Sequence, residues 1–161
     1  MTHETESSWR ICTVGRSHVA DLIRIGEENG LSPWSAQSYI EEIANPNSVM
    51  LRLVCPENEI VGFIVGRVVG PDGSGDAEIY NIGIVPNKHR RGHGTMLLNA
   101  FVKSLQGRAS SVWLEVRESN STAIEFYKKH GFQAMHIRPN FYNGPVESAI
   151  VMKLELGRKK G

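Results

Sequence analysis

The segment from His89 to Thr95 constrains the fold of this 161-residue chain more than any other, and it reads His-Arg-Arg-Gly-His-Gly-Thr. It follows a β-type run, 77–86, and precedes a stretch in which apolar residues recur at helical spacing. A strand, a basic turn and a helix N-terminus together attract an anion, because free backbone N–H groups and the positive end of the helix dipole point to the same place. Gly92 and Gly94 have no Cβ, so they let the backbone approach a ligand closely. The segment therefore predicts a strand–turn–helix unit that binds a phosphate group.

Two other phosphate motifs are excluded. No Gly-Lys-Ser/Thr follows the turn, as a P-loop requires, and the third glycine of the dinucleotide fingerprint is missing. A structural turn with solvated arginines is the remaining alternative. His89 and His93 do not predict a metal site, because Gly92 interrupts the helix that their spacing requires and no glutamate accompanies them.

Apolar periodicity and turn residues predict the other elements along the chain. We expect strands at 9–14, 48–55, 60–69, 77–86, 111–117, 133–142 and 148–156, and helices at 17–30, 33–44, 96–105 and 120–130. A capping box of Thr122 and Glu125 is expected to start the last helix, and Gly131 to end it.

The order of these elements predicts the fold class. The middle of the chain is a strand–helix–strand unit, so the fourth and fifth strands should be parallel and the others antiparallel. We expect an α/β fold with one mixed sheet of about seven strands and helices on both faces. The chain should form a single domain, 1–161, with a polar tail at 1–8 and a basic tail at 157–161.

Composition limits the classes of partner. The formal net charge is +1, and the basic runs are short and not interleaved with aromatic residues, so we expect no nucleic-acid partner. No apolar run approaches the roughly 20 residues of a membrane span, and the polar, acidic start is unlike a signal peptide. Cys12 and Cys55 lie in apolar runs and are interpreted as buried, reduced thiols, which is typical of a cytoplasmic protein.

The run His89-Arg90-Arg91-Gly92-His93-Gly94 resembles the Gln/Arg-x-x-Gly-x-Gly/Ala signature of the GNAT N-acetyltransferases, with His89 where the signature has Gln or Arg. The resemblance extends from about Trp9 to Leu156. It is sharpest for the branch of bacterial ribosomal-protein-alanine N-acetyltransferases, which shares these segments: Pro33-Trp34-Ser35, Asn81 to Pro86, Leu114 to Arg117, Ser119-Asn120, Ala123-Ile124, Phe126-Tyr127, Gly131-Phe132 and Arg138 to Tyr142. It implies acetyl-CoA as the donor, a protein N-terminus as the acceptor, and fourth and fifth strands that splay apart to admit the donor.

The resemblance and the residues together predict a donor site. Backbone groups from Ile82 to Ile84 are expected to pair with the pantetheine arm as an added strand does, with Gly83 keeping the approach open. The N–H of Ile84 is the expected oxyanion donor. The diphosphate is expected on the backbone and side chains of His89, Arg90, Arg91, Gly92, His93, Gly94 and Thr95. Asn120 is expected either to bind the cofactor arm or to cap the helix, and Ile82 and Ile84 also suit an ordinary core.

Acetyl transfer requires a neutral amine. A free α-amine has a pKa of about 8, so roughly a tenth is neutral at pH 7, whereas lysine, with a pKa of about 10.4, is under about a thousandth neutral. A carboxylate that acts through one water is therefore sufficient for an N-terminus. Glu115 is the expected base, and the resemblance places the base of the family there. The alternative for Glu115 is an exposed strand carboxylate or one in a salt bridge, for which Arg117 is the candidate partner. Glu78 is an alternative or auxiliary base.

Tyr127 is the expected general acid. A phenol with a pKa of about 10 stays protonated at neutral pH and donates to a thiolate whose pKa is about 8.5. The resemblance places the acid of the family on this residue and implies that it contacts the cofactor, while a core aromatic is the alternative. The amine is expected to attack acetyl-CoA directly in a ternary complex, with no acyl-enzyme.

The acceptor peptide is expected to lie against a further set of residues, for which ordinary packing is the alternative: Trp34, Glu78, Tyr80, Phe141 and Tyr142. The favoured function is acetylation of a protein α-amine, with the N-terminal alanine of a small-subunit ribosomal protein as the expected acceptor. An acetyltransferase for a small-molecule amine or lysine, and a non-catalytic acyl-CoA-binding module, remain alternatives. The oligomeric state is not predicted.

Overall fold

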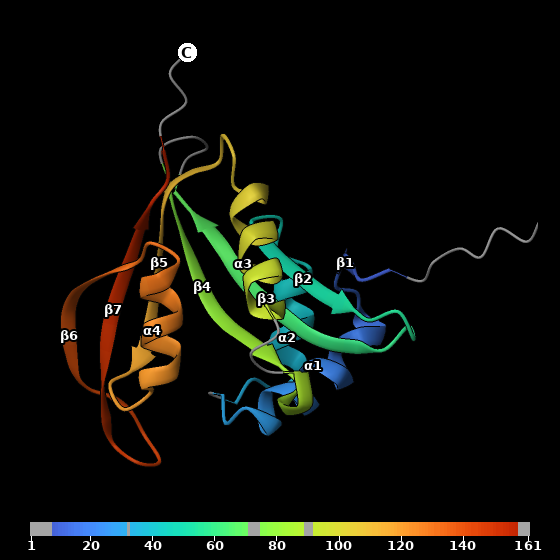
Figure 1. Cartoon of the computed structure of the whole chain (residues 1–161), viewed down its shortest axis with the longest axis horizontal. Helices are drawn as coiled ribbons and strands as arrows, with labels where there is room; N and C mark the ends of the chain where they lie inside the picture. The colour runs from blue at the N-terminus through green and yellow to red at the C-terminus, as the bar shows by residue number, and fades with distance from the viewer. Residues whose placement is uncertain (1–7, 32, 71–74, 89–91, 158–161) are drawn as a thin grey trace, which may run out of the picture. The chain divides into compact units, whose positions relative to one another are not determined.

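The computed structural model describes residues 8–31, 33–70, 75–88 and 92–157 of the chain, and its helices and strands are labelled in Figure 1. Seven strands form one mixed sheet in the order β1-β2-β3-β4-β5-β7-β6. The parallel pairing of β4 with β5 was predicted and is confirmed, and the pairs β1–β2, β2–β3, β5–β7 and β6–β7 are antiparallel. Within the described residues, none of the helices has both the length and the apolar character that a membrane crossing requires.

The chain divides into two compact units. The first comprises residues up to Arg67 and Asn81–Gln106. It contains β1 (Arg10–Thr13), the 3₁₀ helix η1 (Arg16–His18), α1 (Val19–Glu28), α2 (Ala36–Ile43), β2 (Ser48–Val54), most of β3 (Ile60–Val69), the last residues of β4 (Gly75–Ile84), the 3₁₀ helix η2 (Pro86–Lys88) and α3 (His93–Ser104).

In the first unit, α1 and α3 pack on opposite faces of the sheet. A Cβ at Gly83 would lie 3.2 Å from Ile25 of α1, whereas a Cβ at Gly62 would lie 2.5 Å from Ile84 and 3.2 Å from Leu97 of α3. Because Gly83 and Ile84 are neighbours on one strand, their side-chain directions point to opposite faces. This placement of helices on both faces agrees with the predicted fold class.

Gly62→Ala is expected to lower the free energy of unfolding by about 1–3 kcal/mol, because the added methyl group overpacks the contact with Ile84 and the Gly83 carbonyl. Gly26→Ala is the matched control: in the part of the chain that the structure describes, nothing beyond the helix's own backbone lies within 4 Å of its added methyl group, and glycine in a helix interior is unfavourable. We expect it to raise the unfolding free energy by about 0.5–1 kcal/mol. Urea unfolding of both variants measures the difference, and equal effects would contradict the described packing.

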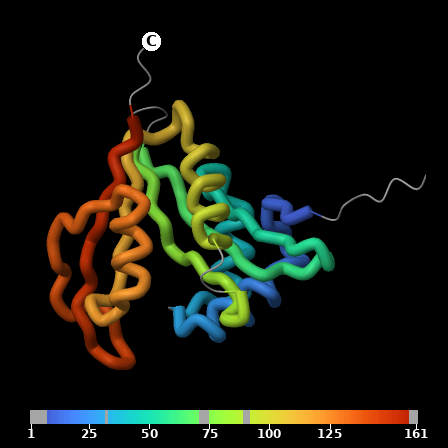
Figure 2. The backbone as a smooth tube through the Cα atoms, in the orientation of Figure 1, coloured from blue at the N-terminus to red at the C-terminus, as the bar shows by residue number. Residues whose placement is uncertain are grey.

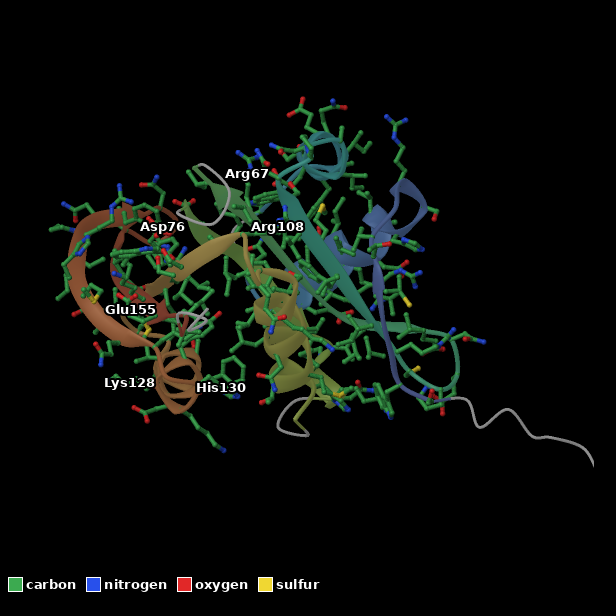
Figure 3. The ribbon with its side chains drawn as sticks, turned by 90° about the horizontal axis from the view of Figure 1, so that it is seen from above. Arg67, Asp76, Arg108, Lys128, His130 and Glu155 are labelled. Carbon is green, nitrogen blue, oxygen red and sulfur yellow. The ribbon has the colours of Figure 1, made fainter. Side chains whose placement is uncertain are left out.

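A buried carboxylate ties α2 to the sheet within the first unit. Glu42 is 4% exposed, and Arg67, labelled in Figure 3, donates to it from Nε at 3.1 Å and from Nη2 at 2.5 Å. The hydroxyl of Ser48 also donates to Glu42. Such two-point charged hydrogen bonding satisfies the buried carboxylate, so we interpret this cluster as structural.

The second unit comprises Val68–Tyr80 and the residues from Gly107 onward. It contains the end of β3, the first residues of β4, β5 (Ala109–Arg117), α4 (Ser121–Lys129), β6 (Gln133–Tyr142) and β7 (Glu147–Glu155). Figure 2 shows β6 and β7 running side by side as the predicted hairpin, and β5 pairs with the other edge of β7. Among the residues described, the β4–β5 ladder ends at the pair Glu78↔Trp113, although β4 continues to Ile84 and β5 to Arg117.

Two local predictions need correction. The N-cap of helix α4 lies two residues before the expected Thr122 of the Thr122–Glu125 box: it is Asn120, whose side chain accepts from the Ala123 N–H at 3.1 Å. Asparagine is among the best N-cap residues, so it takes the position from Thr122. Both cysteines are free thiols and Cys55 is buried, as expected, but Cys12 is only half-buried because β1 is an edge strand.

Candidate active site

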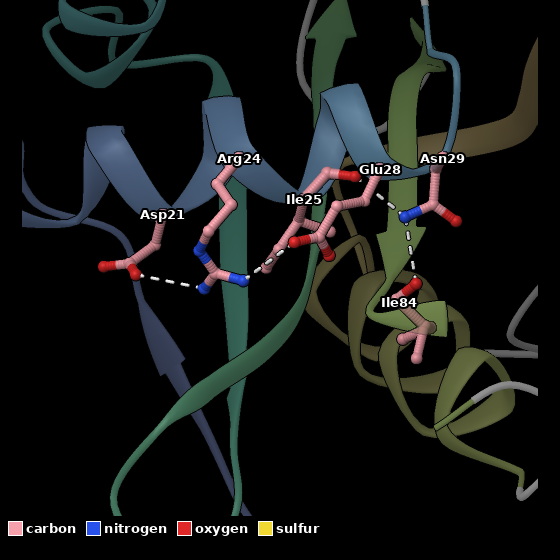
Figure 4. A network of polar contacts seen from close by, with 6 residues as sticks. All are labelled: Asp21, Arg24, Ile25, Glu28, Asn29 and Ile84. Carbon is pink, nitrogen blue, oxygen red and sulfur yellow. Dashed lines mark hydrogen bonds and ion pairs between the residues drawn. The ribbon is translucent and has the colours of Figure 1, made fainter. Parts of the chain in front are cut away.

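In the first unit, the end of β4 is hydrogen-bonded to the residue that follows α1. The side-chain Nδ2 of Asn29 donates to the carbonyl of Ile84 at 2.9 Å and to that of Ile25 at 2.8 Å (Figure 4). The next residue, Val85, donates its N–H to the carbonyl of Val61 at 2.8 Å. One lone pair of the Ile84 carbonyl therefore already accepts a hydrogen bond. The two preceding residues are less accessible than a surface strand would be, since Ile82 is half-buried and Gly83 is buried.

Sequence reasoning missed Asn29. It directly follows α1, where asparagine is a common helix-ending residue, so its position alone indicates only the end of a helix. The hydrogen bond to Ile84 joins residues 55 positions apart, and no local pattern predicts such a contact.

The helix α3 begins at the predicted turn. Gly92 precedes it with φ +79°, and the Gly92 carbonyl accepts from the N–H of Met96 at 3.1 Å. Among the described residues outside its chain neighbours, nothing lies within 4 Å of the position that a Cβ of Gly92 would take, so these residues leave room for a ligand at the turn. Gly94 and Thr95 are half-buried in the first turn of the helix. The predicted ligands His89, Arg90 and Arg91 lie outside the described residues.

The side chain of His93 faces the interior of the first unit. It is 8% exposed and stacks on Trp9, with ring centroids 4.2 Å apart and planes at 26°. Its Nδ1 lies 3.2 Å from the carbonyl of Lys88, and because a carbonyl only accepts, Nδ1 is the donor. We therefore expect His93 to bind a ligand through its backbone N–H and not through its imidazole.

Glu115 lies on β5 in the second unit, opposite Val151 of β7. Its side chain is 35% exposed and accepts from Nη1 of Arg138 at 3.2 Å. The alternative pairing of Glu115 with Arg117 is wrong, because Arg117 instead forms an ion pair with Glu147 at 3.2 Å. Arg117 also donates to the carbonyls of Asn143 and Pro145 at 3.3 Å, so its guanidinium is bound by the β6–β7 turn and not by Glu115.

Two predicted acceptor-binding residues lie beside these arginines. The guanidinium of Arg117 is 4.3 Å from the ring centroid of Tyr142, and that of Arg138 is 4.6 Å from the centroid of Phe141. Burial raises the pKa of Tyr142, the carboxylate of Glu115 raises it further, and Arg117 partly offsets both. The second unit therefore brings Glu115, Phe141 and Tyr142 together around two arginines.

Tyr127 lies on the buried face of α4. It is 6% exposed and contacts Phe126 and Phe132 edge-on, with centroids 5.3 and 5.4 Å away. Burial raises the pKa of its phenol well above the ordinary value, and the nearby Tyr142 adds to the effect. The hydroxyl is therefore protonated throughout the physiological range.

The remaining predicted residues lie in both units. Glu78 and Tyr80 are half-buried on β4 in the second unit, and Trp34 is half-buried in the first, tilted against Tyr39 at 5.2 Å. Asn120 acts as a helix cap, one of its two expected roles. Within the described part of the chain, no group of three His, Cys, Asp or Glu side chains is arranged to hold a metal ion.

The Acetyltransferase (GNAT) family matches residues 19–132. This chain belongs to the GNAT acetyltransferase family. Among its relatives, the [Ribosomal protein bS18]-alanine N-acetyltransferase of Haemophilus ducreyi is 31% identical over 140 residues, which are 84% of this chain and 92% of the relative. That of Salmonella typhimurium is 34% identical over 128 residues, covering 77% and 82%.

The structural comparison agrees with the family. The crystal structure of the ribosomal-protein-S18-alanine N-acetyltransferase from Escherichia coli superposes with a TM-score of 0.80 at 26% identity, covering 95% of this chain and 98% of that one. The predicted GNAT fold is confirmed. The protein is an acetyl-CoA-dependent N-acetyltransferase, as the signature at 89–94 indicated.

Proposed function

We propose that this GNAT enzyme acetylates the α-amino group of a protein N-terminus in the cytosol, and that an N-terminal alanine of a small-subunit ribosomal protein is its acceptor. The relatives support this acceptor, because they are [Ribosomal protein bS18]-alanine N-acetyltransferases and align with most of the length of this chain. The observation that carries the proposal is the partly exposed carboxylate of Glu115, which is paired with Arg138 and, in addition to burial, raises the pKa of Tyr142, while Arg138 lies over the ring of Phe141. This arrangement suits removal of a proton from an amine whose peptide lies against aromatic rings.

The donor site of the proposal lies in the first unit. Backbone groups from Ile82 to Ile84 bind the pantetheine arm, and the Ile84 N–H stabilises the oxyanion. The open turn at Gly92 and the first turn of α3, with Gly94 and Thr95, receive the diphosphate. His89, Arg90 and Arg91 precede this turn, and the two arginines supply its positive charge. Asn29 keeps the end of β4 in place through the Ile84 carbonyl.

The catalytic groups of the proposal lie in the second unit. Glu115 accepts a proton from the ammonium group through a water, and the neutral nitrogen forms a bond to the thioester carbon. The carbon–sulfur bond then breaks, and Tyr127 donates its proton to the sulfur as negative charge develops there. The second proton of the attacking nitrogen leaves as the amide forms and restores the phenol of Tyr127. Glu78 is the auxiliary carboxylate, while Trp34, Tyr80, Phe141 and Tyr142 position the peptide. Asn120 caps the start of α4, and Asn120 and Tyr127 are the residues of this unit proposed as ligands of the cofactor arm.

Thiol release from acetyl-CoA tests the acceptor class. We expect turnover with a peptide that begins with a free alanine, and little with polyamines or free amino acids, because a peptide also contacts the aromatic residues. A peptide with a blocked N-terminus and one lysine is the matched control, since its amine is under about a thousandth neutral at pH 7. Faster thiol release with the blocked peptide than with the free one would contradict the proposal and identify a lysine acetyltransferase.

A further inference from the structure

The stack between Trp9 and His93 joins two segments that are distant in sequence. Trp9 is half-buried and directly precedes β1, whose first residue, Arg10, pairs with Val54 of β2. Arg10 also donates to the side chain of Asn58. The indole is therefore attached to a backbone that the sheet holds, and its ring lies 4.2 Å from the imidazole of His93.

His93 occupies a sensitive position for ligand binding. It is the first residue of α3 and follows Gly92, whose left-handed conformation turns the chain into the helix. Its imidazole is held from two directions, by the indole of Trp9 and by the carbonyl of Lys88. Since the ring and the backbone belong to one residue, fixing the ring also fixes the amides at the start of α3.

We infer that Trp9 is a positioning residue for coenzyme A, acting through His93 to hold the diphosphate-binding turn at the start of α3 in its binding conformation. This inference rests on the donor site proposed above. A turn that is already ordered loses less conformational entropy when the ligand binds, so preordering increases affinity without any new contact to the ligand. The indole itself touches no reacting atom in this account, and its effect should therefore appear in donor binding and not in turnover.

Trp9→Leu and Trp9→Phe form a matched pair of variants. Leucine keeps the apolar bulk but has no ring face, whereas phenylalanine keeps a ring that stacks on the imidazole. Calorimetry with coenzyme A alone measures the dissociation constant and needs no acceptor. We expect Trp9→Leu to raise this constant about five- to tenfold and Trp9→Phe to change it by less than about twofold.

Steady-state kinetics and unfolding complete the test. At saturating acetyl-CoA, kcat with the alanine peptide should stay within about twofold of the wild type in both variants, while KM for acetyl-CoA follows the dissociation constant. Equal affinity of the two variants for coenzyme A would overturn the inference. So would a loss of kcat that accompanies a lowered unfolding midpoint in Trp9→Leu, because it would indicate general disruption. If the wild type binds coenzyme A but does not acetylate the peptide, the proposed acceptor fails while the calorimetric comparison still decides the role of Trp9.

Discussion

Glu115→Gln is expected to lower kcat/KM for an alanine peptide by about 10²- to 10⁴-fold, the usual contribution of a general base. The amide keeps the size of the side chain and can still accept from Arg138, but it does not take up a proton from the ammonium group. Binding of coenzyme A should change by less than about twofold, because the donor site lies on other residues. Initial rates and calorimetry on the same preparation separate the two effects.

The control for this variant is Glu125→Gln, which removes a carboxylate from the exposed side of α4 in the same unit. It should leave kcat/KM within about twofold of the wild type. Glu78→Gln distinguishes the second candidate base. If Glu78→Gln abolishes turnover and Glu115→Gln does not, Glu78 is the principal base and the assignment to Glu115 is wrong.

Tyr127→Phe is expected to lower kcat by about 10²-fold or more, since the departing thiolate loses its hydrogen-bond donor. The ring remains in its contacts with Phe126 and Phe132, so the unfolding midpoint should change little. Burial raises the pKa of the Tyr127 phenol above the ordinary value of about 10, so the hydroxyl keeps its proton up to at least that pH. Deprotonation of Tyr127 should therefore cause no loss of wild-type activity below pH of about 10. Rates measured from neutral to alkaline pH, with both proteins, provide the comparison.

A matched packing control separates loss of the hydroxyl from loss of stability. Phe132→Leu removes a neighbouring ring and should cost up to about 1.5 kcal/mol of unfolding free energy, with little loss of kcat at a temperature where the protein is folded. If Phe132→Leu lowers kcat as much as Tyr127→Phe does, the hydroxyl has no special role and Tyr127 is a core aromatic.

Local features of the site were predictable from the sequence. The glycine turn and the start of α3 follow from short-range rules, because Gly92 adopts the left-handed conformation that ends one element and starts the next. The face of Glu115 follows from strand alternation, which places Val112, Leu114 and Val116 on the buried side. The residue type at each position sufficed for these predictions.

Long-range pairings were not predictable in the same way. The bond from Arg138 to Glu115 spans 23 positions and depends on the register of β6 against β7, which contains two irregularities. Periodicity specifies which face a side chain occupies but not which residue of another strand lies beside it. The same reason explains why Arg117 was the expected partner of Glu115, and why the contacts of Asn29 and Trp9 required the structure.

Tandem mass spectrometry locates the transferred acetyl group and tests the central claim most directly. The substrate is a peptide that begins with alanine and contains one internal lysine, incubated with acetyl-CoA and the wild-type enzyme. We predict acetylation of the α-nitrogen of the alanine, with the lysine unmodified. Acetyl groups on the lysine, or an unmodified peptide although the enzyme binds coenzyme A, would contradict the proposed function.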